Sequence, residues 1–270
     1  MKKWSKAIKA FYEILRNPWL LNHVLSDDTV WRKYLIRNYG LSGGLPVVDL
    51  RTLCPNLSES LEGLAFLGGS SLPTDLALLT SLSRQFEHCR YFEIGTWRGE
   101  SVRNVARYAS ECYTLNLSKA EIMAEGLDER YADLHGFFSR GIRNINHLTG
   151  NSMNFDFGGL QKSFDLVFID GSHHHAYVKN DTEKVFKHLI HGRSIVVWHD
   201  YARSPEHLRP EVMAAILDGT PPEFRRYLYH VSNTLCAVFI RDNLPTMEFR
   251  TPIIPDKVFS LDLHCKDWPT

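Results

Sequence analysis

The stretch Tyr91-Phe-Glu-Ile-Gly-Thr-Trp-Arg-Gly-Glu-Ser101 joins an apolar run to a turn with two glycines and then to a helical pattern. That pattern has apolar residues at i, i+3, i+4 and i+7, namely Val102, Val105, Ala106 and Ala109. The stretch therefore predicts a buried strand, a sharp loop and an amphipathic helix. Gly95 and Gly99 carry no Cβ, so they let the chain turn and let a ligand or the helix approach the backbone. Such a loop before a helix N-terminus is typical of a nucleotide-type cofactor site.

The spacing of the two glycines, G-x-x-x-G, differs from the G-x-G-x-x-G spacing of dinucleotide-binding loops. Glu93 precedes the first glycine, and a carboxylate at the mouth of the loop would repel a pyrophosphate. It suits instead a ligand that carries an ammonium group and hydroxyls. The segment resembles motif I of the class I S-adenosylmethionine-dependent methyltransferases, E/D-x-G-x-x-x-G. The alternative is a buried strand followed by an ordinary glycine turn.

A second apolar run, Phe164-Asp-Leu-Val-Phe-Ile169, ends in Asp170-Gly171 and predicts a strand that is buried on both faces. Apolar positions after it predict a helix that stops at Gly192. The run Ser194-Ile-Val-Val-Trp198 predicts the next strand and leads into His199-Asp200. In an open parallel sheet, ligands bind outside the carboxyl ends of the strands. We therefore expect five polar side chains to converge there, namely Glu93, Asp170, His173, His199 and Asp200.

The order I-D-G-x-H-x-x-x-Y and then H-D-Y resembles a methyltransferase subfamily with many small-molecule O-methyltransferases. The resemblance covers about residues 70 to 242. It implies a Rossmann-like, doubly wound α/β fold with a seven-stranded sheet whose last strand is inserted antiparallel. It also implies methyl transfer from S-adenosyl-L-methionine to a small-molecule hydroxyl. Two alternatives stay open: a metal-dependent hydrolase that uses Asp170, His199 and Asp200, and a noncatalytic binding protein on the same fold.

Helix and strand patterns alternate from residue 75 and end in a hairpin over residues 227–231 and 235–240. The alternation predicts a mostly parallel sheet with an antiparallel edge hairpin. We therefore expect the methyltransferase domain over residues 75–242 and a C-terminal tail over residues 243–270. Residues 1–74 have amphipathic helix patterns and few strand signals, so they predict a helical N-terminal extension. The extension either packs plainly on the sheet domain or serves as a lid or dimer element.

The resemblance implies roles for the residues around the cofactor. Glu93 would hold the amino end of S-adenosylmethionine or the loop around it, and the backbone of residues 95–99 would fit the methionine part. Asn116 would bind the ribose, while Asn151 and Ser152 would face the adenine. The family usually has acidic residues at these two asparagine positions, and an amide lacks the charge-assisted strength of a carboxylate. The expected cofactor-binding residues are Glu93, Gly95, Thr96, Trp97, Gly99, Ser101, Asn116, Asn151, Ser152 and Asp170.

Asp170, His199 and Asp200 combine carboxylate oxygens and an imidazole at adjacent predicted strand ends, a set that can bind Mg²⁺, Mn²⁺ or Zn²⁺. Resemblance to catechol-type O-methyltransferases implies a divalent ion there, with a histidine in place of the usual carboxylate. The alternative is that His199 and Asp200 only bind loops and substrate. His173 matches the basic residue of metal-dependent relatives, and an imidazole can accept a hydroxyl proton. We therefore expect His173 and Asp170 to be catalytic; the alternative for His173 is a role at the helix start.

The composition agrees with a soluble enzyme, because 270 residues of which 44% are hydrophobic can bury a large core. Lysine plus arginine and aspartate plus glutamate both number 31, which gives no overall bias toward nucleic acid or an anionic membrane. The five cysteines have no C-x-x-C spacing, which indicates reduced thiols. Lys6 and Lys9 interrupt any signal-peptide core. We expect a cytoplasmic protein with a small-molecule acceptor and no nucleic-acid or membrane partner, with a homodimer as one option.

Overall fold

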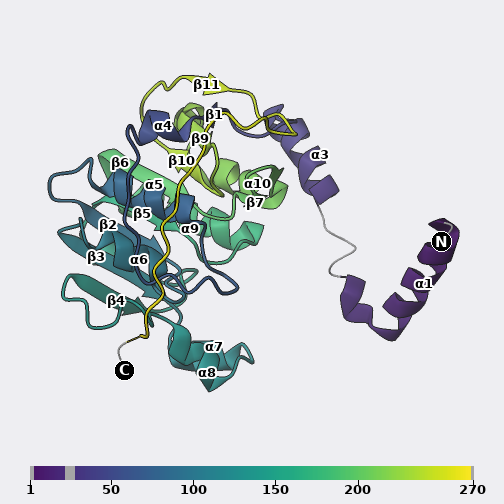
Figure 1. Ribbon diagram of the computed structural model, residues 1–270, viewed down its shortest axis with the longest axis horizontal. Coiled ribbons are helices and arrows are strands. Elements are labelled where there is room, and N and C mark those ends of the chain that lie inside the picture. Colours follow the sequence, from purple (N-terminus) through teal and green to yellow (C-terminus); the bar gives the residue numbers. More distant parts are fainter. Residues whose placement is uncertain (1–2, 22–27, 269–270) are drawn as a thin grey trace.

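The computed structural model describes residues 3–21 and 28–268, and a nine-stranded sheet forms its centre (Figure 1). The strands of this sheet are β1 (Val47–Val48), β2 (Arg90–Ile94), β3 (Glu111–Asn116), β4 (Ile145–Thr149), β5 (Phe164–Ile169), β6 (Ile190–Trp198), β9 (Leu228–Val231), β10 (Ala237–Phe239) and β11 (Thr246–Met247). Their order is β11-β1-β9-β10-β6-β5-β2-β3-β4. A separate two-stranded sheet pairs β7 (Ala202–Ser204) with β8 (His207–Leu208).

The strands from β6 to β4 run parallel to one another. β10 lies antiparallel between β6 and β9, which is the inserted antiparallel strand that the resemblance implied. The central strands are covered on both sides, as their continuous apolar runs predicted; all but the first residue of β2 are buried. The predicted Rossmann-like, doubly wound and mostly parallel sheet is therefore confirmed.

Two details of the sheet prediction were wrong. The sheet has nine strands rather than seven, and the hairpin β9–β10 does not form its edge. β1 pairs in parallel with β9, where Val47 lies opposite His230, and β11 pairs antiparallel with β1. Both added strands have two residues, which is too short for a two-residue period to be visible in the sequence. Segments before residue 75 and after residue 242 thus complete the sheet.

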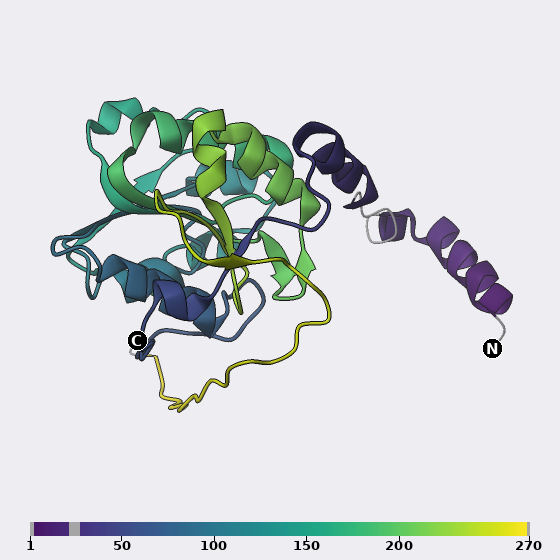
Figure 2. The same ribbon diagram turned by 90° about the horizontal axis from the view of Figure 1, so that it is seen from above.

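Helices cover both faces of the sheet (Figure 2). The α-helices are α1 (Lys3–Arg16), α3 (Asp28–Tyr39), α4 (Leu50–Leu53), α5 (Pro73–Ser83), α6 (Glu100–Val105), α7 (Lys119–Ala124), α8 (Glu129–Leu134), α9 (His175–His188) and α10 (Pro210–Gly219). One buried cluster lies under α9 and α10 and includes Val185 and Ile216, and the other lies under α4, α5 and α6 and includes Leu79 and Val102. Short 3₁₀ helices are η1 (Pro18–Leu20), η2 (Gly158–Leu160) and η3 (Pro222–Tyr227).

The helix after β5 ends earlier than the sequence predicted. α9 ends at His188, and Gly192 lies inside β6 instead of ending the helix. The carbonyl of Leu189 accepts a hydrogen bond of 2.8 Å from the backbone N–H of Phe164 in β5. The chain therefore joins the sheet as soon as the helix ends, so the last apolar positions of the predicted helix belong to a turn and a strand.

The N-terminal extension contacts the sheet domain through α3. Asp218 of α10 accepts hydrogen bonds from the hydroxyls of Tyr34 and Tyr39, and the ring of His175 lies 2.8 Å from it. Trp31 stacks on His175 with ring centroids 4.6 Å apart. α1 lies away from the sheet domain (Figures 1 and 2). A search of the described helices finds none that is long and apolar enough to cross a membrane.

Candidate functional site

The two glycines of the loop after β2 are required by protein contacts. Gly95 has φ +98°, and a Cβ there would overlap the backbone carbonyl of Asp170 at the end of β5. Gly99 has φ +79°, and a Cβ there would overlap the hydroxyl of Ser139. Both positions favour glycine because of their backbone angles as well as their neighbours. The glycines therefore permit the close approach of protein segments, whereas the sequence had suggested a ligand or the following helix.

The carboxyl of Glu93 lies inside the protein, behind the loop. It accepts hydrogen bonds from the hydroxyl of Tyr91 at 2.6 Å and from that of Thr114 at 3.2 Å. Burial raises the pKa of Glu93 to about 8, although hydrogen bonds from Ser101 and Tyr91 act in the opposite direction. The hydroxyl of Thr96 also lies 2.6 Å from that of Thr114. Three expected cofactor residues, Glu93, Thr96 and Ser101, thus form a buried polar cluster that supports the loop.

The outer side of the loop is covered by two other segments. Arg98 is buried, and its guanidinium donates hydrogen bonds to the Gly68 carbonyl at 3.0 Å and the Ser70 hydroxyl at 2.7 Å. The backbone N–H of Phe138 donates to the Arg98 carbonyl at 2.8 Å. Trp97 has φ +42°, an uncommon angle for a residue with a side chain, and its ring lies 4.9 Å from that of Tyr131. Residues 67–70 of the extension therefore contact the loop, which the sequence did not reveal.

Asn116, Asn151 and Ser152 lie at the ends of the neighbouring strands β3 and β4. Asn116 ends β3, and its carbonyl accepts a hydrogen bond of 2.8 Å from the backbone N–H of Gly150. The side-chain oxygen of Asn151 accepts from the N–H of Met153 at 2.9 Å, which leaves one of its two lone pairs for another donor. All three expected residues are partly exposed. The structure thus brings them to the same edge as the loop after β2.

Asp170, His199 and Asp200 form a compact cluster at the ends of β5 and β6. Nδ1 of His199 lies 3.0 Å from Oδ1 of Asp170 and 3.8 Å from Oδ2 of Asp200. One possible ligand atom from each of the three residues lies within 4.8 Å of the other two. Asp200 has φ +57°, and Arg209 lies 3.1 Å from its other carboxylate oxygen. The expected convergence of these three residues is therefore present in the structure.

The fourth member of the cluster, Asp75, was missed in the sequence. It is fully buried in the first turn of α5, and its Oδ2 lies 3.1 Å from Nε2 of His199. Its Oδ1 accepts a hydrogen bond of 2.8 Å from the backbone N–H of Leu235. Oδ2 also accepts from the N–H of Leu72, so the sequence signal was that of an ordinary helix N-terminus. Only the fold brings Asp75 to His199.

The charges of the cluster oppose the effect of burial. Burial raises the pKa of Asp170, and the positive charge of His199 opposes that rise. Burial would lower the pKa of His199, but Asp170, Asp200 and Asp75 raise it well above its usual value. Burial would raise the pKa of Asp200, but its hydrogen bond with His199 and the charges of His199 and Arg209 lower it. The carboxylates of the cluster therefore favour the positively charged form of His199.

The three consecutive histidines point to different neighbours, as expected for adjacent residues. His175 binds Asp218, and His174 lies 3.7 Å from Glu211. His173 is exposed and lines a small cleft together with Asp170, His199 and Asp200. Desolvation, followed by the positive charge of Arg209, lowers the pKa of His173. A neutral imidazole thus faces the cleft at neutral pH.

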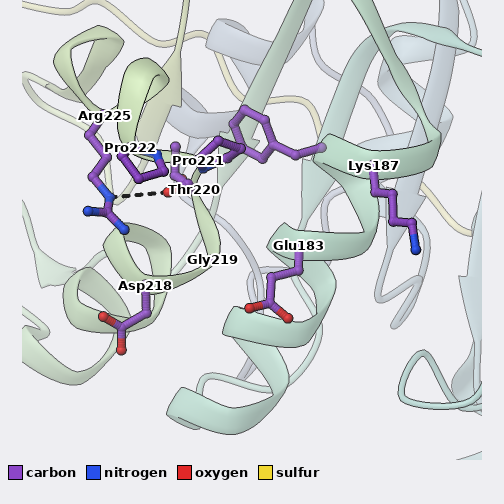
Figure 3. Close-up of a pocket in the computed structure, with 9 residues that line it drawn as sticks. Glu183, Lys187, Asp218, Gly219, Thr220, Pro221, Pro222 and Arg225 are labelled. Carbon is purple, nitrogen blue, oxygen red and sulfur yellow. Dashed lines mark hydrogen bonds between the residues drawn. The ribbon is translucent and has the colours of Figure 1, made fainter.

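A larger pocket of about 320 Å³ lies elsewhere, between α9, α10 and η3 (Figure 3). Lys187 and Glu183 of α9 line one side of it, and Arg225 lies on the other. Nε of Arg225 donates hydrogen bonds to the carbonyls of Leu217 at 2.8 Å and Thr220 at 3.1 Å. Arg225 therefore holds the end of α10, and none of the residues that line this pocket belongs to the cluster at the strand ends.

Residues 92–201 match a family model that is described as a methyltransferase domain. This part of the chain is therefore similar to a methyltransferase domain. The matched segment begins in β2 and ends just after Asp200, so it includes both the glycine loop and the acidic cluster. No curated protein matches the sequence.

Solved methyltransferases are similar to this chain at low identity. The SAH-bound methyltransferase PaMTH1 of Podospora anserina is 18% identical over 64% of this chain and 81% of that chain, with a TM-score of 0.47. The O-methyltransferase TomG of Streptomyces achromogenes, in complex with SAM, is 17% identical over 80% and 99%, with a TM-score of 0.42. An O-methyltransferase of Bacillus cereus, in complex with SAH, is 15% identical over 84% and 97%, also with a TM-score of 0.42.

Proposed function

We propose that this protein transfers a methyl group from S-adenosylmethionine to a hydroxyl of a small molecule. One observation carries the proposal: the glycine loop and the acidic cluster meet at adjacent strand ends. The N–H of Asp170 donates to the Ile94 carbonyl at 2.8 Å, and that of His199 donates to the Ile169 carbonyl at 3.0 Å. Open α/β sheets bind ligands at this edge. A cofactor at the loop and an acceptor at the cluster would therefore lie side by side.

In this proposal, the residues around the cofactor divide into two groups. Glu93, Thr96 and Ser101 support the loop from inside, because their side chains are buried and bonded to one another or to Thr114. Asn116 would bind the ribose, and Asn151 with Ser152 would face the adenine, because these side chains lie partly exposed at the next strand ends. Trp97 and the backbone at Gly95 and Gly99 would border the methionine part.

Asp170, His199 and Asp200 fit a divalent ion, since they offer two hard oxygen donors and one imidazole nitrogen within 4.8 Å of one another. Such an ion, when bound, would orient the acceptor hydroxyl and make it more acidic. The carboxylate of Asp75 can only accept a hydrogen bond, so Nε2 of His199, which faces it, carries a proton. The other ring nitrogen, Nδ1, faces Asp170 and Asp200. Arg209 would hold Asp200 in place from the opposite side.

His173 would take the proton of the acceptor. Its lowered pKa keeps the imidazole neutral, and it lines the same cleft as Asp170 and Asp200. As the acceptor oxygen bonds to the methyl carbon, the carbon–sulfur bond breaks and its electron pair stays on sulfur, which gives S-adenosylhomocysteine. The hydroxyl proton passes to His173. Positioning of the two reactants would supply most of the rate enhancement.

Calorimetry with S-adenosylmethionine and S-adenosylhomocysteine, each with and without Mg²⁺, tests the proposal. We expect both cofactor forms to bind with one site per chain. Tight metal binding without any cofactor binding would favour a metal-dependent hydrolase. Binding of neither would favour a noncatalytic protein on this fold. A screen of phenolic, sugar and hydroxy-acid acceptors would then define the hydroxyl that is methylated.

A further inference from the structure

Helix α1 presents an uncovered apolar face. Five large side chains, at positions that recur on one side of a helix, are between 55% and 81% exposed: Trp4, Ile8, Phe11, Tyr12 and Leu15. In the described part of the chain, none of the α1 residues is buried. Large apolar side chains gathered in this way usually mark a contact surface. This face of α1 therefore needs an occupant.

The rest of α1 is basic. It carries Lys3, Lys6, Lys9 and Arg16, whose guanidinium lies over the Tyr12 ring, and Glu13 is the only acidic residue of the helix. Four cations and one anion give α1 a formal charge of +3 (4 − 1), whereas the whole chain is neutral. The charge of the rest of the chain must therefore balance this local excess. The overall neutrality on which we based the expectation of no membrane partner conceals a strongly basic amphipathic helix.

We propose that α1 docks on the surface of an anionic lipid bilayer, with its apolar side chains in the interface and its lysines at the headgroups. Charge complementarity favours this occupant over a second copy of α1, because two such helices would bring +3 against +3. Trp4 and Tyr12 are residue types that prefer the interface between water and lipid. At 14 residues, about 21 Å long, α1 lies in the interface rather than across the bilayer.

The position of α1 agrees with a tether for the sheet domain. The helix stands apart from that domain, while α3, the next described helix, is fixed to α10 and α9 through Asp218 and Trp31 (Figure 1). None of the α1 residues belongs to the glycine loop or the acidic cluster. The inference is therefore independent of the proposed methyl transfer, and its test needs no substrate.

Co-sedimentation of the full chain with phosphatidylcholine vesicles, with and without phosphatidylserine, tests this proposal. We expect binding to the phosphatidylserine vesicles that is at least about tenfold stronger than to phosphatidylcholine alone and that weakens as salt is added. Phe11→Asp should abolish binding, and Lys6→Glu should reduce it about tenfold or more. Matched controls in the C-terminal segment, Ile254→Asp and Arg250→Glu, alter residues that are also exposed, and both variants should bind vesicles as the unchanged protein does.

Far-ultraviolet circular dichroism and an unfolding curve for each variant show whether it is folded. A loss of vesicle binding can then be distinguished from a loss of structure. Equal binding to both vesicle types, or none to either, would overturn the proposal. A dimer in analytical ultracentrifugation that Phe11→Asp abolishes, without vesicle binding by the unchanged protein, would assign the face to a second copy and would also overturn it. Cofactor binding should be the same in all four variants.

Discussion

The carboxyl of Glu93 is fully buried among hydroxyl groups, and burial raises its pKa from an ordinary 4.5 to about 8. Between these pH values the unfolded chain loses this proton while the folded chain keeps it, so stability falls as the pH rises. In the unchanged protein, the free energy of unfolding should fall by up to a few kcal/mol between pH 4.5 and about 8, and in Glu93→Gln this fall should be absent. Urea unfolding across this range measures the effect. An unchanged pH slope in the variant would show that Glu93 ionises normally.

Asp75 touches His199 only on the side away from the cleft, so it acts through that histidine. Asp75→Asn would place an amide N–H against Nε2, which favours a proton on Nδ1 and removes a donor from the proposed metal site. We expect about 10- to 100-fold weaker Mn²⁺ binding, measured by calorimetry on the cofactor-free protein. The matched control is Asp165→Asn, because Asp165 of β5 also binds a histidine, His191 of β6, at 3.0 Å. Equal Mn²⁺ affinity in both variants would contradict this role.

His173 has a lowered pKa and no described role in holding α9, so its proposed task is proton transfer. His173→Ala should lower kcat on the true acceptor by about 10²-fold or more, with little change in S-adenosylmethionine affinity. The activity of the unchanged enzyme should fall as the pH drops below the ordinary histidine range, because protonation removes the base. Steady-state kinetics across pH, with calorimetry for the cofactor, separates the two effects. A fully active variant would remove His173 from the mechanism.

At the scale of elements, the predictions succeeded where a segment carried its own periodic pattern. β5 begins and ends at the expected residues, Phe164 and Ile169, because a run of strand-forming residues bounded by loops is a local signal. The end of α9 was misplaced, because a hydrogen bond from Phe164 decides where the chain joins the sheet. β1 and β11 were missed, since strands of two residues exist only through their partners.

The attachment of α3 depends on one carboxylate. Asp218 accepts hydrogen bonds from Tyr34 and Tyr39 and binds His175, so Asp218→Ala would leave three polar groups without this partner. We expect α3 to open more often, because its local stability falls by about 1–3 kcal/mol. Amide exchange over residues 28–39 should therefore be faster. Hydrogen exchange with mass spectrometry measures it. The control is Asp128→Ala, which removes the N-cap of α8 and should speed amide exchange only in α8. Unchanged exchange of α3 in Asp218→Ala would refute the role of Asp218.

At the scale of the whole molecule, the site is built from segments that are far apart in the chain. The sequence placed Asp170, His199 and Asp200 together because the carboxyl ends of parallel strands share one edge of the sheet. It could not place Asp75, whose contact with His199 spans 124 residues, nor the contact of Arg98 with residues 67–70. Such contacts depend on how helices and loops pack onto the finished sheet. The pattern of the strands therefore predicted that the three proposed metal ligands lie together, and the fold supplied the neighbouring residues that contact them.

His230 joins the three parts of the molecule, because its N–H binds the Pro46 carbonyl of the extension at 2.9 Å and its ring lies 5.5 Å from Phe249 of the tail. Burial lowers its pKa from 6.5 to about 4, against opposing effects of the Thr234 backbone and Asp75. Between these pH values His230 is protonated in the unfolded chain but not in the folded chain. The free energy of unfolding therefore falls on acidification by up to about 3 kcal/mol. His230→Phe should flatten this acid slope in urea unfolding, whereas His207→Phe, at an exposed position, should not. If both variants keep the slope, the acid sensitivity belongs to another group, and the junction of extension, sheet and tail does not set it.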